Sequence, residues 1–301
     1  MTSLYAKLTL VAVIWGGTFI AGRVAAPEMS AATAALWRYV VASAALVAML
    51  LFREGRFPRL ASPQWVRVTL LGLTGVAAYN LCFMAGLETV PASRGSLIIA
   101  LNPAATLLGA ALFLHEPLTA AKVGGMVIAL LGVAIELSGG NPLRLFDGGA
   151  GIGELLLVGA VLSWAAYTLI GKGLTGLSPL AITTYAALIG TAILAVAVAM
   201  RGEVGLPHVS GKAWLALIYM GTAGTAIAFV WFLEGVQVLG PARAAIFVNL
   251  VPVAAITLGV LLLGERVTVA MLAGAALVVA GVFIINRPAA STPAPACAHP
   301  H

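Results

Sequence analysis

The sequence predicts an all-α integral membrane protein with ten transmembrane helices, arranged as two inverted five-helix repeats. Of its 301 residues, 61% are apolar and only 9% are charged, which leaves too little polar surface for a water-soluble body. Charge-free stretches of about 20 residues recur along the chain, the length an α-helix needs to cross a bilayer. They lack the alternation of apolar and polar residues that an outer-membrane barrel requires.

Ten apolar segments bounded by proline, glycine or charge give the predicted spans. The first segment has neither a basic region before it nor a small-residue cleavage site after it. We therefore expect it to be retained as a span and not removed as a signal peptide. In chain order the spans are 4–22, 31–52, 65–87, 93–114, 120–138, 152–171, 178–200, 212–235, 242–263 and 268–286.

The spans divide the chain into a first repeat at 1–138 and a second at 152–286, joined by a connecting loop at 139–151. Residues 287–301 are rich in proline and alanine without periodicity, so we expect a disordered tail. Loop lysines and arginines number nine on the side of the N-terminus and six on the other side. Because cytoplasmic loops carry the excess of these residues, we expect both termini to be cytoplasmic, in a bacterial-type inner membrane.

Shifting the sequence against itself by 149 residues brings uncommon residues of the two halves into register. A constant shift across tryptophan, proline and charged residues indicates a duplication. Each copy holds five spans, an odd number, so the second copy crosses the membrane in the opposite direction. The matched pairs include Trp15 with Trp164, Trp65 with Trp214, Gly72 with Gly221, Gly75 with Gly224, Gly86 with Gly235, Pro103 with Pro252 and Glu116 with Glu265.

Inverted repeats are found in many transporters, whose substrate sites lie near the bilayer midplane between the repeats. When the two halves exchange conformations, the site opens alternately to each side of the membrane. The duplication therefore predicts transport by alternating access. The expected partners are a small-molecule substrate and the lipid bilayer.

Motifs in both halves resemble the EamA-type repeat of the drug/metabolite transporter superfamily. The resemblance covers nearly the whole chain, to about Asn286. One difference is that Ala187 stands in the second copy where the first has Arg38. The motifs are Trp15-Gly16-Gly17-Thr18-Phe19, Trp37-Arg38-Tyr39, Asn102-Pro103 and His115-Glu116-Pro117-Leu118-Thr119, then Ser163-Trp164-Ala165-Ala166-Tyr167, Val251-Pro252 and Gly264-Glu265-Arg266-Val267-Thr268.

The resemblance implies a ten-helix exporter of amino acids or other metabolites. More narrowly, the chain is similar to the YddG-type aromatic amino-acid exporters of this family. That similarity implies amino acids with aromatic or other apolar side chains as substrates. The alternative within the same fold is a polyspecific exporter of drugs or other metabolites, which should accept quaternary cations.

Trp15 and Trp164 lie eleven and twelve residues into their spans, near the middle of the bilayer at about 1.5 Å per residue. This depth is wrong for an interfacial aromatic belt. Because the repeat relates the two residues, they would flank a central cavity from opposite sides. Two interpretations remain open for each, contact with the substrate and packing between helices.

Further candidates lie in the third, fourth and ninth spans. Tyr79 and Phe83 are four residues apart and share a helix face, with Asn80 turned elsewhere. Polar side chains in spans usually face the bundle interior, so Tyr79 and Asn80 are candidates for lining a cavity. Asn102 and Asn249 each precede a proline, where they either bind substrate or repair the broken backbone ladder.

Arg38 is the most deeply placed full charge, about two turns into its span. It either holds a substrate carboxylate or extends to the nearer headgroups. No Asp or Glu falls near the centre of any span, although a proton-coupled exporter of cations ordinarily needs one. This pattern favours neutral or zwitterionic substrates.

Other classes of function are disfavoured. Basic residues occur singly, so no nucleic-acid partner is expected. None of the four histidines is central in a span and the two cysteines lack metal-ligand spacing, so we expect no enzyme, no metal and no other cofactor. A channel would need a filter sequence, and none is recognisable. The oligomeric state stays open, a monomer included.

Overall fold

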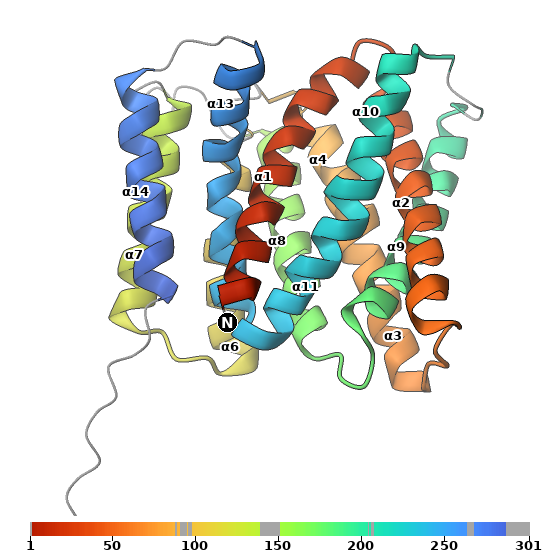
Figure 1. Cartoon of the computed structure of the whole chain (residues 1–301), viewed down its shortest axis with the longest axis horizontal. Helices are drawn as coiled ribbons and strands as arrows, with labels where there is room; N and C mark the ends of the chain where they lie inside the picture. Colours follow the sequence, from red (N-terminus) through yellow and green to blue (C-terminus); the bar gives the residue numbers. More distant parts are fainter. Residues whose placement is uncertain are drawn as a thin grey trace, which may run out of the picture.

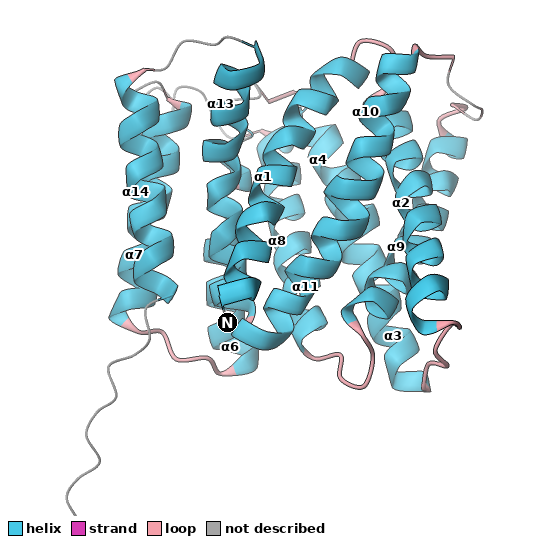
Figure 2. Cartoon of the chain, viewed as in Figure 1, coloured by secondary structure: helices cyan, strands magenta, loops and turns pink. Residues whose placement is uncertain are grey.

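The computed structural model describes residues 2–87, 89–90, 95, 98–138, 151–203, 205, 208–263 and 268–286. Within these ranges the chain is almost entirely helical and contains no strand (Figure 2). The predicted fold class is confirmed. Most of the predicted connecting loop and all of the predicted tail lie outside the described residues.

Eight of the described helical segments are long and apolar enough to cross a membrane, and two shorter apolar helices complete the ten predicted spans. The first copy contains α1 (Thr2–Ala25), α2 (Ala31–Glu54), α3 (Ser62–Leu71), η1 (Gly72–Ala78), α4 (Tyr79–Leu87), α6 (Asn102–Leu114) and α7 (Ala120–Leu137). The second contains α8 (Ile152–Lys172), α9 (Pro179–Met200), α10 (Gly211–Gly221), η3 (Thr222–Ile227), α11 (Ala228–Leu239), α12 (Pro241–Ala245), η4 (Ile246–Asn249), α13 (Leu250–Leu263) and α14 (Val269–Asn286).

A π-helical turn interrupts the third span of each copy. In η1 the N–H of Tyr79 donates to the carbonyl of Thr74, five residues earlier. In η3 the N–H of Ala228 donates to the carbonyl of Ala223, also five residues earlier. The shift of 149 converts the first bond into the second. Because π turns are rare, their equivalent positions confirm the duplication at the level of the backbone.

The second spans of the two copies begin with matching caps. The hydroxyl of Ser30 accepts the N–H of Thr33 at the start of α2, and the hydroxyl of Ser178 accepts that of Ala181 at the start of α9. Each serine also donates to a glutamate of the opposite copy, Glu203 for α2 and Glu54 for α9. The two serines differ by 148 positions, one fewer than the shift that relates the neighbouring spans.

The shift of 148 corrects one expected pairing. A Cβ added to Gly221 would lie 2.7 Å from the carbonyl of Arg38, and one added to Gly72 would lie 2.8 Å from the carbonyl of Ala186. Because Gly72 and Gly221 are equivalent, Arg38 corresponds to Ala186 and not to Ala187. The ungapped comparison was wrong here because the segment from Trp164 to the cap Ser178 is one residue shorter than the segment from Trp15 to the cap Ser30. The arginine still has no charged counterpart.

Helices α7 and α14 form a separate pair at one side of the bundle (Figure 1). Their contact is made by glycines. A Cβ added to Gly132 would lie 2.6 Å from the carbonyl of Gly274, and one added to Gly281 would lie 2.5 Å from that of Gly125. Under the shift of 149, Gly132 corresponds to Gly281 and Gly125 corresponds to Gly274, so each contact is the equivalent of the other. The last spans of the two copies therefore meet as equivalents, with their backbones as close as side-chain-free positions allow.

The centre of the bundle interleaves the two copies. Helix α1 packs against the α10–α11 span of the second copy, and α8 packs against the α3–α4 span of the first. A Cβ added to Gly235 of α11 would lie 2.7 Å from the side chain of Leu8, and one added to Gly86 of α4 would lie equally close to that of Leu157. These contacts are again equivalent, and they hold the first span of each copy against the third span of the other.

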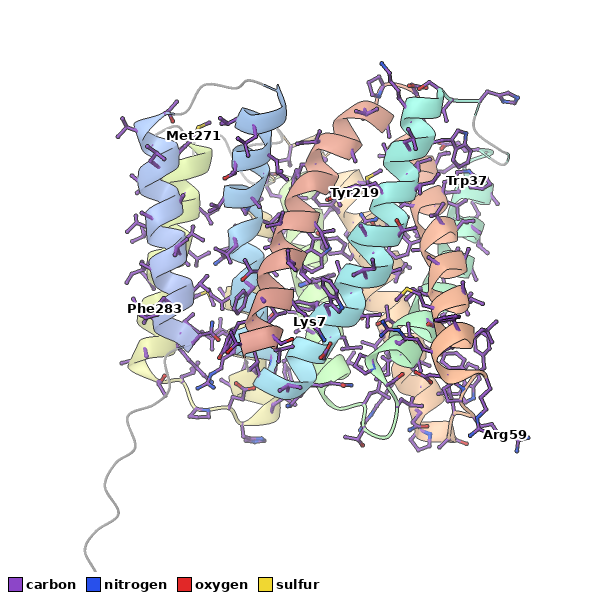
Figure 3. All side chains as sticks on the ribbon, in the orientation of Figure 1. Lys7, Trp37, Arg59, Tyr219, Met271 and Phe283 are labelled. Atoms are coloured by element: carbon purple, nitrogen blue, oxygen red, sulfur yellow. The ribbon has the colours of Figure 1, made fainter. Side chains whose placement is uncertain are left out.

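Charged and aromatic side chains mark the two ends of the bundle. Lys7 and Arg59 lie toward one end and Trp37 toward the other (Figure 3). Lys7 pairs with Glu234 at 2.8 Å, and the rings of Trp37 and Trp214 meet edge-on at 5.6 Å. The sequence placed Lys7 and Arg59 on the same side of the membrane, and they do share an end of the bundle. Which end faces the cytoplasm stays a prediction.

Candidate substrate-binding site

Aromatic side chains of both copies meet in the buried centre of the bundle. The ring centroids of Trp15 in α1 and Trp164 in α8 are 5.6 Å apart, edge-on. Phe229 of α11 lies 5.9 Å from Trp15 and 5.4 Å from Trp164. Phe232, one turn further on, lies 5.6 Å and 5.5 Å from the same rings. We call these four residues the aromatic cluster. In it the two equivalent tryptophans contact each other, and that they flank a substrate cavity stays a prediction.

The two tryptophans differ in their hydrogen bonds. The indole Nε1 of Trp15 donates to the carbonyl of Gly224, 2.8 Å away in the π turn η3. The indole Nε1 of Trp164 is buried and has no hydrogen-bond partner among the described residues. The equivalent acceptor for it would be the carbonyl of Gly75 in η1. An N–H buried without an acceptor is unfavourable, so Trp164 holds an unused donor inside the aromatic cluster.

Tyr79 and Phe83 extend the aromatic cluster along α4. Their rings are parallel to within 5° with centroids 5.8 Å apart, which confirms the predicted shared face. Tyr79 also lies 5.5 Å from Trp164. Both residues are partly exposed, unlike the tryptophans. They therefore extend the aromatic cluster from the buried centre to less buried positions on α4.

Asn80 is turned away from that stack. Its Nδ2 donates to the carbonyl of Val76 at 2.6 Å and lies 3.5 Å from the hydroxyl of Tyr39. The first bond is made to a carbonyl of the π turn η1, one turn earlier in the same span. Asn80 thus supports the neighbouring Tyr39, and the ring of Tyr39 in turn lies 6.5 Å from Phe229 of the aromatic cluster.

Arg38 reaches the same region from α2. Its Nε donates to the hydroxyl of Thr225, 2.8 Å away, and its guanidinium carbon lies 5.5 Å from the centre of the Tyr39 ring. Both groups are neutral. The side chain is partly buried, and its Nε contacts η3 of the second copy. Whether Arg38 binds a substrate stays a prediction.

Asn102 and Asn249 lie at breaks in the fourth and ninth spans. Asn102 begins α6, and Asn249 ends the short 3-10 segment η4 that precedes α13. Both are buried; the Oδ1 of Asn102 and both polar atoms of Asn249 have no hydrogen-bond partner among the described residues. Helix α6 packs on α8 and η4 packs on α1. The two asparagines therefore adjoin the helices of the tryptophans without a described contact to the aromatic cluster.

Comparison with known proteins decides the family. The profile of the EamA-like transporter family matches residues 3–137 and again residues 151–287. The chain belongs to this family. Each match covers one copy of the duplication, so the EamA-like repeat is the five-span unit described above.

Relatives of this EamA-like transporter are themselves named as transporters. The uncharacterized transporter YyaM of Bacillus subtilis is 27% identical, with 93% of this chain and 92% of that protein aligned. A probable terminal-alkyne amino-acid exporter of Streptantibioticus cattleyicolor is 32% identical over the same shares of the two chains. The uncharacterized inner membrane transporter YedA of Escherichia coli K12 is 29% identical, over 88% of this chain and 84% of its own length.

The fold of the transporter is shared with a solved crystal structure. The two chains align with a TM-score of 0.79, over 95% of this chain and 97% of the other, at 21% identity. At that identity the likeness concerns the fold alone. Fold and family together make the chain a multi-pass membrane transporter.

Sequence reasoning missed two members of the aromatic cluster, although the repeat contained a signal for one. Phe232 is the equivalent of Phe83 under the shift of 149, so the candidate Phe83 pointed to it. Phe229 corresponds to Asn80 and had no such signal. Phe229 does lie four residues after Thr225 on the same helix face, and this polar residue was a signal for the inward face of the eighth span.

A second feature of the transporter lies on another face of α8. An open apolar cleft of about 290 Å³ separates α6 from α8. Ala166 lines it and is two residues from Trp164, so the two side chains point about 200° apart around the helix. The exposed ring of Phe113 also lines the cleft, which suits a lipid chain better than a substrate that must cross the membrane.

Proposed function

We propose that this transporter exports amino acids with aromatic or other apolar side chains, by alternating access through the centre of the bundle. The observation that carries the proposal is the aromatic cluster with its unused indole N–H on Trp164. Aromatic walls bury planar apolar groups and stack on them, and a few polar groups fix orientation. The relative named as a probable amino-acid exporter supports this substrate class.

Alternating access is supported by unequal contacts at equivalent positions. Trp15 is bonded to Gly224, whereas Trp164 is not bonded to the equivalent Gly75. Such inequality is expected when two inverted copies hold different conformations at one time. When the copies exchange conformations, the site closes to one side of the membrane and opens to the other. In this proposal the copies at 1–138 and 152–286 move relative to each other.

The remaining features of the proposal concern location and chemistry. We place the transporter in an inner membrane with both termini in the cytoplasm, which agrees with the shared end of Lys7 and Arg59 and with the printed name of YedA. We assign no catalytic role and no cofactor, because the proposed cycle needs only binding and conformational change.

The test is efflux from liposomes that contain the purified protein and preloaded amino acids. We expect saturable efflux of phenylalanine and tryptophan that exceeds efflux of threonine. Trp164→Ala should abolish the preference, whereas Trp214→Ala, which changes a tryptophan at the end of the bundle, should keep it. Absence of efflux for all amino acids would contradict the proposal, and efflux of a quaternary ammonium compound would favour the polyspecific drug exporter.

A further inference from the structure

We propose that Arg38 binds the carboxylate of the transported molecule, so that the substrates are carboxylic acids with an apolar or aromatic body. This inference rests on the proposed function, because it assigns the substrate class of the same site. It goes further in one respect. It requires the carboxylate and leaves the amino group dispensable.

The first argument is an uncompensated charge. Arg38 lies seven residues after the start of α2, roughly 10 Å along the helix axis, and its described contacts are a threonine hydroxyl and a tyrosine ring. By contrast, Lys7 and Lys122 pair with glutamates at 2.8 and 2.9 Å. Among the described residues, no carboxylate lies within ion-pair distance of Arg38. A charged side chain inside a span is energetically unfavourable unless it has a partner. In this proposal the partner of Arg38 is the substrate carboxylate.

The second argument is the orientation of the guanidinium. Its Nε is fixed by the hydroxyl of Thr225, which is fully buried and donates its own proton to the carbonyl of Met220 in the π-turn region. One of the five N–H donors of the arginine is thereby used, and the four on the terminal nitrogens remain. A guanidinium held at one nitrogen presents a planar fork that matches the two oxygens of a carboxylate.

The third argument is the distance to the aromatic cluster. The guanidinium lies over Tyr39, and the ring of Tyr39 lies 6.5 Å from Phe229. Asn80, the residue after Tyr79, lies 3.5 Å from the hydroxyl of the same Tyr39, and the ring of Tyr79 lies 5.5 Å from Trp164. An aromatic acid with its ring against Tyr79 and Trp164 would place its carboxylate toward Arg38. The anchor and the aromatic walls thus belong to one site.

The fourth argument concerns which anion fits. The equivalent position in the second copy is Ala186, so the duplication supplies one guanidinium and not two. One positive charge neutralises a monocarboxylate, whereas a phosphate with nearly two negative charges would remain under-compensated in a site walled by aromatic rings. The arrangement favours a monoanionic head on an apolar body.

The experiment compares three ligands that share one phenyl ring. Phenylalanine has both charged groups, phenylpropionate has only the carboxylate, and phenethylamine has only the amine. Two quantities are measured: efflux from liposomes, and binding to the detergent-solubilised protein, which is detected as an increase in melting temperature. Both are measured for the unchanged protein, Arg38→Gln, Arg38→Lys and Arg59→Gln. Arg59 is an exposed arginine of the loop after α2 and serves as the control.

We expect phenylalanine and phenylpropionate to bind and phenethylamine to bind much more weakly. Arg38→Gln should weaken binding of both acids by roughly tenfold to a hundredfold, the range for a charge-assisted hydrogen bond, with partial recovery in Arg38→Lys and no change in Arg59→Gln. The melting temperatures of the variants without ligand show whether each variant is folded. If Arg38→Gln does not fold, the comparison with Arg38→Lys still tests the role of Arg38.

The outcomes separate this inference from the proposed function. If phenethylamine binds as tightly as phenylalanine, or Arg38→Gln and Arg38→Lys leave binding of both acids unchanged, the role of Arg38 is refuted while amino-acid export stands. If phenylpropionate binds in an Arg38-dependent way but no amino acid is exported, the inference stands and the proposed function falls. If none of the three ligands binds the unchanged protein, the inference is overturned.

Discussion

Replacing Trp15 by phenylalanine removes one hydrogen bond from the centre of the bundle and keeps an aromatic ring there. The lost bond joins the indole Nε1 to the carbonyl of Gly224 at 2.8 Å. That carbonyl would remain buried without its side-chain donor, at a cost of about 1 to 3 kcal/mol in the free energy of unfolding. The smaller ring also gives up packing against Phe229 and Phe232.

The matched control is Trp164→Phe. It removes the same part of an indole from the same aromatic cluster, so the loss of packing is comparable, but Trp164 has no hydrogen bond to lose. It also removes a buried donor that is unpaired, which offsets part of the packing loss. We therefore expect Trp15→Phe to be the more destabilising substitution by about 1 to 3 kcal/mol.

The assay is reversible unfolding in mixed micelles with increasing dodecyl sulfate, followed by far-ultraviolet circular dichroism. This signal reports helix content and is insensitive to the loss of a tryptophan fluorophore. Equal destabilisation by the two substitutions, or greater destabilisation by Trp164→Phe, would refute the reasoning. It would mean that the indole of Trp15 contributes no more through its hydrogen bond than an indole that has none.

Two further predictions concern the edges of the bundle. Gly132→Leu should destabilise the protein by about 1 to 3 kcal/mol in the same assay, because its Cβ would lie 2.6 Å from a backbone carbonyl of α14, whereas Gly124→Leu, with nothing within 4 Å, should be nearly neutral; equal effects would contradict the close helix contact. Hydrogen bonds from Ser30 and then Thr33 lower the pKa of Glu203 from its ordinary 4.5, so the folded state binds the proton less readily than the unfolded state and stability should fall as the pH drops below about 4.5. Glu203→Gln should weaken this acid dependence of the unfolding midpoint, and an unchanged profile would rule out the glutamate as its source.

The sequence predicted the architecture well because two strong constraints act on it. Bilayer thickness fixes the length of each apolar run, and rare residues such as Trp15 and Trp164 reveal the duplication. The same signals predicted that these tryptophans lie at equivalent depth. The four-residue spacing of Tyr79 and Phe83 predicted their stacked rings for the simple reason that residues at this spacing share a helix face.

The facing of other residues was not predictable, because lipid removes the usual signal. A helix of a soluble protein shows a polar stripe opposite its buried face, whereas spans such as α13 and α14 are apolar on all sides. The inward faces of such spans are therefore not readable from their sequences. The residue missing between Trp164 and the cap Ser178 was likewise hidden, since runs of alanine and leucine align almost equally well one residue out of register. Only caps and close glycine contacts fix that register.

The two copies share their backbone but not their chemistry, and the difference suits the proposed substrate. Both have the π turn, the serine cap and the central tryptophan at corresponding positions. The charge at Arg38 is present once, as is an indole N–H left free on Trp164. A symmetric site would bind a symmetric molecule best. Recognition of a molecule with one carboxylate and one apolar end requires the copies to diverge at the side chains that contact it, and the backbone between them has to stay equivalent for the site to open on both sides.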